Sequence, residues 1–150
     1  MTHSPARNVV ADFIDRVDRA ISGADADPYA LMADDVTVLV SGTTPLSGHY
    51  PGLEIVKHVL VNTAWHKLTG GRVRLIDAVA EENRVGALLE IIAETRSGKT
   101  YNEARDPAGC VFSVSEDKIN FINLFPDTTL IETVIFDHKF VPNQPQSGDG

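Results

Sequence analysis

Cysteine is almost absent from the 150-residue sequence, which contains only Cys110. A single cysteine excludes an intrachain disulfide, so the fold must be stable without one. Cys110 precedes Val111 and Phe112, and this apolar setting favours a small buried side chain over a reactive thiol. The five histidines have no spacing typical of a metal site, and no glycine-rich phosphate loop follows a strand-like segment. We therefore expect neither a metal nor a cofactor.

Long apolar runs and basic clusters are absent too. No segment approaches the roughly 20 apolar residues of a membrane span, and the N-terminal residues show no apolar segment of signal-peptide type. Lys and Arg total 13 while Asp and Glu total 21, which gives a formal charge of −8. Such a charge repels phosphate backbones. The sequence therefore predicts a cytoplasmic protein that binds neither membranes nor nucleic acids.

Length and composition fit one globular domain. Hydrophobic residues make up 43% of the sequence, an ordinary share for a protein that buries a core. We assign the domain to residues 1–141. Residues 142–150 are rich in Pro, Gln, Ser and Gly, a composition that predicts a disordered tail.

The first predicted helix begins at Ser4 and Pro5, a capping side chain followed by a proline in the first turn. Apolar residues then recur at helical spacing until Gly23, and Asp18 is among the residues left for water. Further helices are predicted over residues 29–33, 53–66 and 128–136. In the second of these, the side chains expected to face inward are Ile55, Val56, Val59, Leu60 and Ala64.

Strand-like segments dominate the second half of the chain. The predicted strands are residues 36–40, 72–81, 84–96, 100–114 with an interruption near Pro107, and 118–125. The glycine- and proline-rich residues 41–52 are expected to form a loop. Helices followed by an antiparallel meander indicate the α+β class. A long curved antiparallel sheet wrapped by three to four helices would make a cone-shaped α+β barrel with one open end, a natural small-molecule pocket.

Three local signatures occur in an order that resembles SnoaL-like proteins of the nuclear transport factor 2-like (NTF2-like, cystatin-like) superfamily. The acidic pair Asp34-Asp35 leads into a strand, and Gly48-His49-Tyr50-Pro51-Gly52 is similar to a G-x-Y-x-G motif before a helix. Near the end, Asp117-Lys118-Ile119 and Phe125-Pro126-Asp127-Thr128 are similar to the family's D-G-K-I and Y-x-D-T segments. The resemblance covers about residues 8–136 and implies the NTF2-like fold.

The resemblance does not name a reaction, because the superfamily includes isomerases, polyketide cyclases, epoxide hydrolases and dehydratases. The ketosteroid isomerase base would correspond to Val40, which cannot accept a proton, and its first-helix tyrosine to Phe13. Arg105 and Asp106 are adjacent, so they would point to opposite faces of a strand, unlike the Arg-x-Asp pair of limonene epoxide hydrolases. The acid/base aspartate of polyketide cyclases does correspond to Asp127.

Asp127 is therefore the candidate catalytic residue. In a regular last strand it shares one face with Ile119, Phe121, Asn123 and Phe125. Desolvation favours the protonated form of a carboxyl group, which lets an aspartate in apolar surroundings exchange protons near neutral pH. The competing interpretation is structural, because Asp127 also stands where a helix begins and can cap it. The sequence leaves both roles open.

Six residues form the predicted ligand-binding set. Tyr101 lies on a strand face with Glu103 and Arg105, which could hold a polar ligand or form an ion pair across the sheet. Trp65 and His66 end the third helix, where a histidine can face the pocket or cap the surface. The complete set is Asn123, Phe125, Tyr101, Trp65, His66 and Tyr50.

The sequence thus predicts a protein that binds a small apolar or oxygenated molecule. If it is an enzyme, the expected reaction is cofactor-free cyclisation, isomerisation or dehydration, with Asp127 as the acid/base and Asn123 or Tyr101 positioning an oxygen. The alternative is a non-catalytic ligand-binding or dimerisation module. A homodimer is expected because the helices suffice to cover one face of the sheet; the predicted contact face carries Leu88, Ile92 and Ile122.

Overall fold

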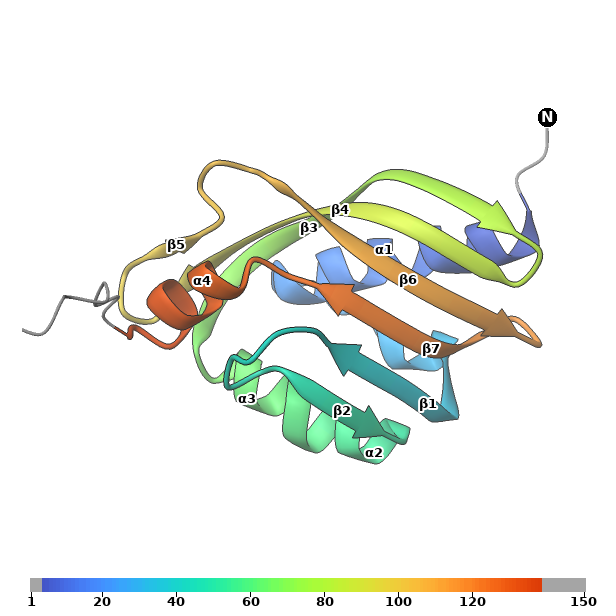
Figure 1. Ribbon diagram of the computed structural model, residues 1–150, viewed down its shortest axis with the longest axis horizontal. Coiled ribbons are helices and arrows are strands. Elements are labelled where there is room, and N and C mark those ends of the chain that lie inside the picture. The colour runs from blue at the N-terminus through green and yellow to red at the C-terminus, as the bar shows by residue number, and fades with distance from the viewer. Residues whose placement is uncertain (1–3, 139–150) are drawn as a thin grey trace, which may run out of the picture.

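The computed structural model describes residues 4–138 and shows one curved sheet with helices packed on its concave side (Figure 1). Helix α1 (Pro5–Ile21) begins as predicted, because Ser4 Oγ accepts a hydrogen bond from the backbone N–H of Arg7 at 3.1 Å. Its buried residues include Val10, Phe13 and Ile14, which face the sheet. The predicted tail, residues 142–150, lies outside the described residues.

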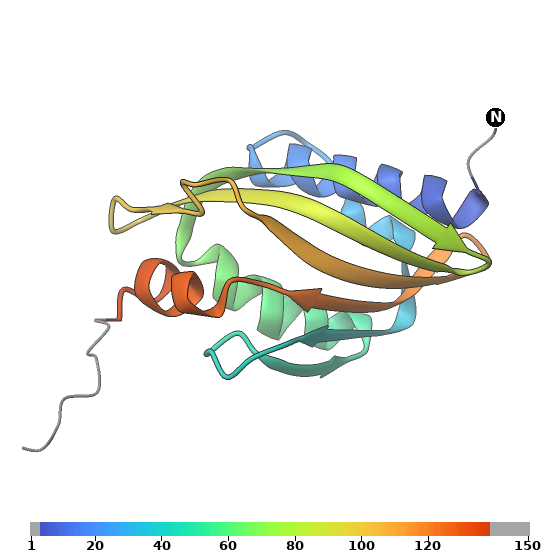
Figure 2. The same ribbon diagram turned by 45° about the horizontal axis from the view of Figure 1, so that its top comes forward.

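Seven strands form the sheet in the order β2-β1-β7-β6-β4-β3, with β5 paired to β4. Their bounds are β1 (Met32–Val40), β2 (Gly48–Pro51), β3 (Leu68–Glu81), β4 (Arg84–Thr95), β5 (Thr100–Tyr101), β6 (Pro107–Ser115) and β7 (Lys118–Phe125). All neighbours are antiparallel except β1 and β7, which run parallel. The sheet is therefore antiparallel as expected except at one pair, because β1 lies beside β7 and runs in the same direction. The sheet curls strongly around α1 (Figure 2), which confirms the cone-shaped α+β class.

Three differences from the expected elements have local causes. The expected short helix after Asp27 is a 3₁₀ turn, η1 (Pro28–Leu31), and β1 begins directly after it at Met32. Residues 41–52 were expected to be a loop, but Gly48–Pro51 forms β2 because its backbone pairs with β1. The long strand after Thr100 is broken over residues 102–106, before Pro107, where Asn102 and Arg105 adopt positive φ angles.

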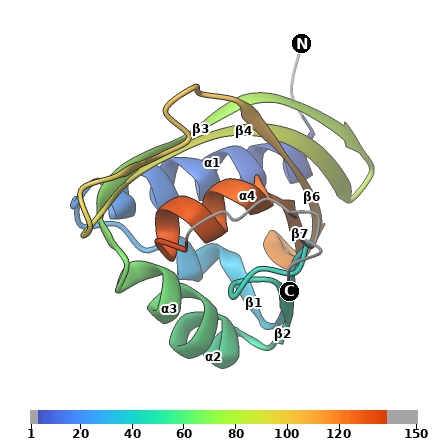
Figure 3. The same cartoon turned by 60° about the vertical axis from the view of Figure 1, so that its left-hand side comes forward.

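Two helical segments complete the cone. The second helix runs from α2 (Leu53–Ile55) through the π-helical η2 (Val56–Val61) to α3 (Asn62–Trp65) and lies opposite α1 (Figure 3). The C-terminal segment, α4 (Thr128–Leu130) with the π-helical η3 (Ile131–Ile135), lies across the end of the sheet that contains β5. These positions enclose a space between α1, the second helix and the concave face of the sheet.

Asp18 was expected to face water, but it fixes α1 to the sheet. Its carboxylate accepts hydrogen bonds from Nε and Nη2 of Arg72 at 2.9 and 3.1 Å and from the backbone N–H of Val73 at 2.9 Å. The hydrogen bond from Arg72 lowers the pKa of Asp18, an effect that partial burial opposes and the Val73 amide reinforces. The pair joins the C-terminal half of α1 to β3, so it holds one wall of the enclosed space in place.

Candidate functional site

A cavity of about 640 Å³ occupies the space between α1, the second helix and the concave face of the sheet. This volume lies within the usual range for small-molecule sites. The sheet contributes inward-facing side chains from several strands, among them Val38, Val73, Leu89, Phe112 and Leu124. At one point in its wall, the rings of Phe13 and Phe112 meet edge to face with centroids 6.2 Å apart.

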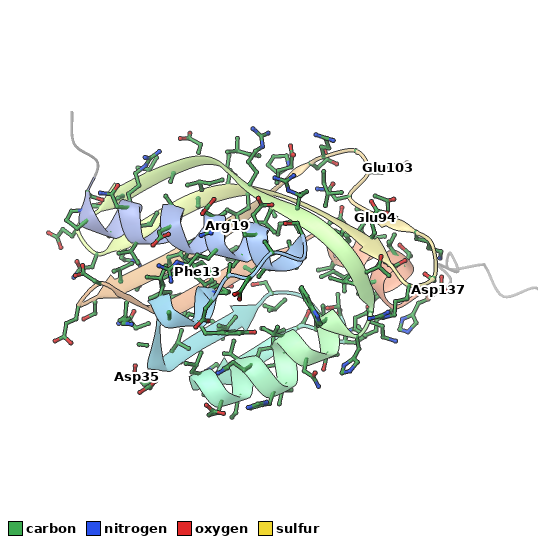
Figure 4. The ribbon with its side chains drawn as sticks, turned by 180° about the vertical axis from the view of Figure 1, so that it is seen from behind. Phe13, Arg19, Asp35, Glu94, Glu103 and Asp137 are labelled. Atoms are coloured by element: carbon green, nitrogen blue, oxygen red, sulfur yellow. The ribbon has the colours of Figure 1, made fainter. Side chains whose placement is uncertain are left out.

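The lining of this cavity is apolar, and it includes no aspartate or glutamate from the described part of the chain. Few of the lining residues carry a polar side-chain group; they are Tyr29, Lys57, Asn62, Trp65 and Cys110. Figure 4 shows Phe13 beneath α1, whereas Asp35, Glu103 and Asp137 lie at the periphery of the molecule. An occupant of the cavity would therefore be held chiefly by apolar contacts.

Burial controls the ionisation of two of these groups. It raises the pKa of the Cys110 thiol to about 12. The thiol therefore stays protonated at neutral pH and cannot act as a nucleophile. Burial also raises the pKa of Tyr29, and the nearby charge of Asp27 adds to the rise. Both side chains are thus neutral parts of the wall.

The second helix supplies the side of the cavity that reaches solvent. Trp65, whose relative exposure is 47%, and Asn62 are the exposed residues of the lining. The connection after α1 also contributes Ala26 and Pro28 to the lining.

The π-helical turns explain why the predicted inner face of this helix was partly wrong. Ile55 and Val59 were expected to face inward, but they are 41% and 50% exposed. Lys57 and Val61 line the cavity instead. A π-turn closes i→i+5 hydrogen bonds and so takes up an extra residue, which rotates the apolar stripe after Val56 relative to α-helical spacing. Such turns are frequent at functional sites. Ile55 precedes the π-turns, so its exposure has another cause.

A second, smaller cavity of about 220 Å³ lies at the end of the sheet near β5. Three of the residues predicted for the site meet there: Tyr101, Phe125 and Asp127. Asn102 and Asp106 are further polar members of its wall, and Ile91 lines both cavities. Burial raises the pKa of Tyr101; the backbone amide of Asp127 opposes this rise and the Asp127 charge adds to it.

Asp127 caps a helix in the structure, which is one of the two roles that the sequence left open for it. Its Oδ1 accepts a hydrogen bond from the backbone N–H of Leu130 at 3.0 Å, at the start of α4. The residue is exposed, and it lines the small cavity but not the large one. Its role as an acid or base stays a prediction, and that chemistry would take place beside Tyr101 rather than in the apolar cavity.

The remaining predicted site residues are dispersed. Of them, Trp65 lines the large cavity. Tyr50 donates its hydroxyl hydrogen to the carbonyl oxygen of Leu46 at 2.8 Å, and Asn123 Oδ1 accepts a hydrogen bond from Ser41 Oγ at 3.2 Å. His66 is exposed at the end of α3, where Nδ1 lies 2.8 Å from the carbonyl oxygen of Asn62.

A β-bulge explains why Asn123 and Phe125 do not face the large cavity. The register between β6 and β7 shifts at Ser113 and Val114, which pair with Phe121 and Ile119. One extra residue in β7 turns every later side chain to the other face. The expected single face from Ile119 to Asp127 was therefore wrong: Ile119 is buried together with Ile122, whereas Asn123 and Phe125 point outward.

The sequence did not predict Tyr29 and Lys57 as site residues, yet both line the large cavity and both are partly exposed. The Asp27-Pro28 start of η1 places Tyr29, and the rotated stripe of the second helix places Lys57. Among residues 4–138, no group of three or more His, Cys, Asp or Glu side chains is arranged to hold a metal ion. No helix in this part of the chain is long and apolar enough to cross a membrane.

Comparison with known proteins identifies the fold. No protein-family profile matches the sequence, and no curated protein is significantly similar to it. An NTF2-like protein of unknown function from Burkholderia pseudomallei superposes with a TM-score of 0.74 at 15% identity, over 89% of this chain and 98% of the other. TerC, co-crystallised with polyporic acid, gives 0.70 at 19% identity over 89% and 99%. A putative SnoaL-like polyketide cyclase from Jannaschia gives 0.68 at 12% identity over 93% and 99%. The chain therefore has the NTF2-like fold that the motifs predicted.

Proposed function

We propose that the protein binds a small, largely apolar molecule in the large cavity. The observation that carries this proposal is a space of about 640 Å³ lined almost wholly by apolar side chains and open on one side. An occupant that fills an apolar space of this size gains both dispersion and burial energy. TerC, which has a similar fold, was co-crystallised with polyporic acid, and this supports the proposal.

The same geometry favours binding over chemistry in this cavity. An acid/base site needs a carboxyl or imidazole group within reach of the reacting atoms. The described residues that line the large cavity include no Asp, Glu or His, and its thiol is held protonated. A cofactor-free proton transfer by Asp127 would use the small cavity, where Tyr101 could position an oxygen.

Fluorescence titration with N-phenyl-1-naphthylamine, a neutral apolar dye, tests the binding proposal. The dye should bind at micromolar concentration with enhanced, blue-shifted emission. Leu124→Trp places an indole in the cavity and should abolish the response. Val79→Trp is the matched control, because Val79 is 72% exposed outside the cavity. Equal dye binding by wild type and Leu124→Trp would show that the dye binds elsewhere and would overturn the proposal.

We also propose that the convex face of the sheet forms a homodimer. Leu88 of β4 pairs with Gly109 of β6, and Gly109 pairs on its other side with Phe125 of β7. Leu88 and Phe125 are 44% and 48% exposed, and a Cβ built at Gly109 would meet nothing within 4 Å. The result is an exposed apolar strip that suits a symmetric contact. Ile122, expected on this face, instead lines the large cavity because of the bulge in β7.

Sedimentation equilibrium tests the dimer at micromolar protein concentration. The monomer has a mass of 16.3 kDa, so the wild type should sediment at about twice that value. Leu88→Lys places a charge in the strip and should give the monomer mass. A wild type that sediments as a monomer would refute the dimer without affecting the binding proposal.

A further inference from the structure

Lys57 is the one basic residue among the described residues that line the large cavity. It extends from η2 toward the 3₁₀ turn η1, where its Nζ lies 5.1 Å from the centroid of the Tyr29 ring. Tyr29 also lines the cavity, so the two side chains meet across its edge from two different elements. Both are partly exposed, which places the ammonium group where apolar lining gives way to solvent.

The charge of Lys57 is not neutralised by any carboxylate of residues 4–138 within 4.0 Å. Five other described basic residues also have no carboxylate within 4.0 Å, but none of them lines the large cavity: Arg7, Lys67, Arg84, Arg96 and Lys118. Glu54, which lies three residues before Lys57 in the sequence, pairs with His58 instead.

We propose that Lys57 binds an anionic group of the ligand, so that the natural ligand is an apolar molecule that carries one carboxylate. This inference rests on the proposed binding function and specifies its ligand class. The apolar body would fill the cavity, and the carboxylate would lie at the edge beside Lys57 and accept a hydrogen bond from its ammonium. The described lining holds no carboxylate, and the nearby Asp27, whose charge acts on Tyr29, already accepts a hydrogen bond from the backbone N–H of Tyr29.

The chemistry of the edge favours a carboxylate over a second cation or a neutral group. A charged acceptor forms a stronger hydrogen bond with an ammonium than a neutral acceptor does. Low-polarity surroundings strengthen this attraction, while contact with solvent spares the carboxylate full desolvation. The Tyr29 hydroxyl, whose proton is retained because burial and the Asp27 charge raise its pKa, is a further donor on the same edge.

Displacement of N-phenyl-1-naphthylamine by decanoate and by 1-decanol at pH 7.5 tests the proposal. The two competitors share an apolar chain and differ in charge. Lys57→Met should weaken decanoate binding by about 5- to 20-fold, because a hydrogen bond to a charged group is lost at a partly solvated position. Decanol binding should change by less than about twofold. Lys57→Arg should retain most of the decanoate affinity, and added salt should weaken decanoate binding to the wild type but not to Lys57→Met.

Lys67→Met is the matched control. Lys67 is exposed and its Nζ lies 5.4 Å from the Phe136 ring centroid, a comparable contact, but it does not line the cavity. Its removal should leave both competitors unchanged. Equal weakening of decanoate and decanol in Lys57→Met would show that Lys57 only packs against Tyr29, and would overturn the anion proposal while dye binding still supports the cavity. Absence of dye binding by the wild type would overturn both proposals.

Discussion

The two cavities of this protein differ in nearly every physical property. The large one has a volume of about 640 Å³, an apolar lining and one cation at its edge. The small one has about 220 Å³ and is lined in part by Tyr101, Asn102, Asp106 and Asp127. Space and acid groups are thus separated within residues 4–138: the described lining of the large cavity includes no Asp or Glu, whereas the smaller cavity is lined by Asp106 and Asp127. This separation is the basis of the proposal that the large cavity binds a ligand.

The difference arises from the two faces and the ends of one sheet. The concave face carries apolar side chains from every long strand, and α1 and the second helix pack against it. The small cavity lies where the strands stop, around the break at residues 102–106 and the start of α4. Strand ends expose backbone groups that need polar partners, so caps and turn residues gather there. The polar side chains at this end of the sheet therefore stabilise strand and helix ends whether or not a ligand binds there.

The largest expected effect concerns the thiol in the large cavity. Because burial raises the pKa of Cys110 to about 12, almost none of it is thiolate at pH 8. Alkylation by iodoacetamide should be roughly 10³-fold slower in the native protein than in urea-unfolded protein. The rate is followed by mass spectrometry. A native rate close to the unfolded rate would show that water enters the cavity freely, and the contrast between the two cavities would fail.

A substitution that fills the large cavity should affect dye binding, whereas a matched substitution in the small cavity should not. Leu124→Trp should weaken dye binding by at least about 100-fold, because the indole occupies the volume that the dye needs. Ala108→Trp makes the matched change in the wall of the small cavity and should leave dye affinity within about twofold. Isothermal titration calorimetry measures both affinities. If Ala108→Trp weakens binding as strongly as Leu124→Trp, the two cavities act as one site.

The sequence was a good guide to the fold, because its elements are specified locally. Ser4 with Pro5 places the start of α1, and the turn at Glu116-Asp117 precedes β7, which has the predicted bounds Lys118–Phe125. Strand β2 was missed because it depends on pairing with β1 across a loop rather than on its own residues. The parallel pairing of β1 with β7 is likewise a long-range choice that local patterns do not encode.

The site was harder to predict, because its geometry depends on single-residue shifts. The bulge in β7 and the π-turns of η2 each displace the pattern by one residue. The first turned Asn123 outward, and the second brought Lys57 into the lining. Neither the bulge nor the π-turns can be predicted from local sequence patterns, because both depend on how the segments pack against the rest of the fold. Trp65, a predicted site residue, does line the large cavity. Its position at the end of the second helix made this prediction less dependent on the exact helical period.

Asp127 provides the next, smaller test of the comparison. Because Asp127 caps α4, Asp127→Ala should lower the free energy of unfolding of the protein by about 0.5–2 kcal/mol. Asp127→Asn should lower it much less, because Asn also caps helices. Dye binding in the large cavity should be unaffected by either change. Urea unfolding and dye titration measure these outcomes. Weakened dye binding by Asp127→Asn would connect this carboxylate to the large cavity and revive its predicted acid–base role there.

The smallest expected effect concerns the clamp that holds α1 over the large cavity. Asp18→Asn should lower the unfolding free energy by about 1 kcal/mol at pH 7, because a charge-assisted pair with Arg72 becomes a neutral hydrogen bond. Asp15→Asn is the control, since Asp15 pairs with Arg19 on the exposed side of the same helix and should cost about 0.5 kcal/mol or less. Urea unfolding of each variant at several pH values measures the difference.

The pH dependence of that difference distinguishes the clamp from a general effect on α1. The folded protein lowers the pKa of Asp18 below its unfolded value of about 3.9. A lowered pKa means that the carboxylate contributes its full stabilisation above the unfolded value and loses it as the pH falls through the folded value. The gap between wild type and Asp18→Asn should therefore stay constant from pH 7 to about 5 and close below about pH 4. A gap that persists at pH 3 would show that Asn disturbs packing rather than removing a charge. A gap that closes as expected would locate the electrostatic attachment of the cavity wall in this one pair.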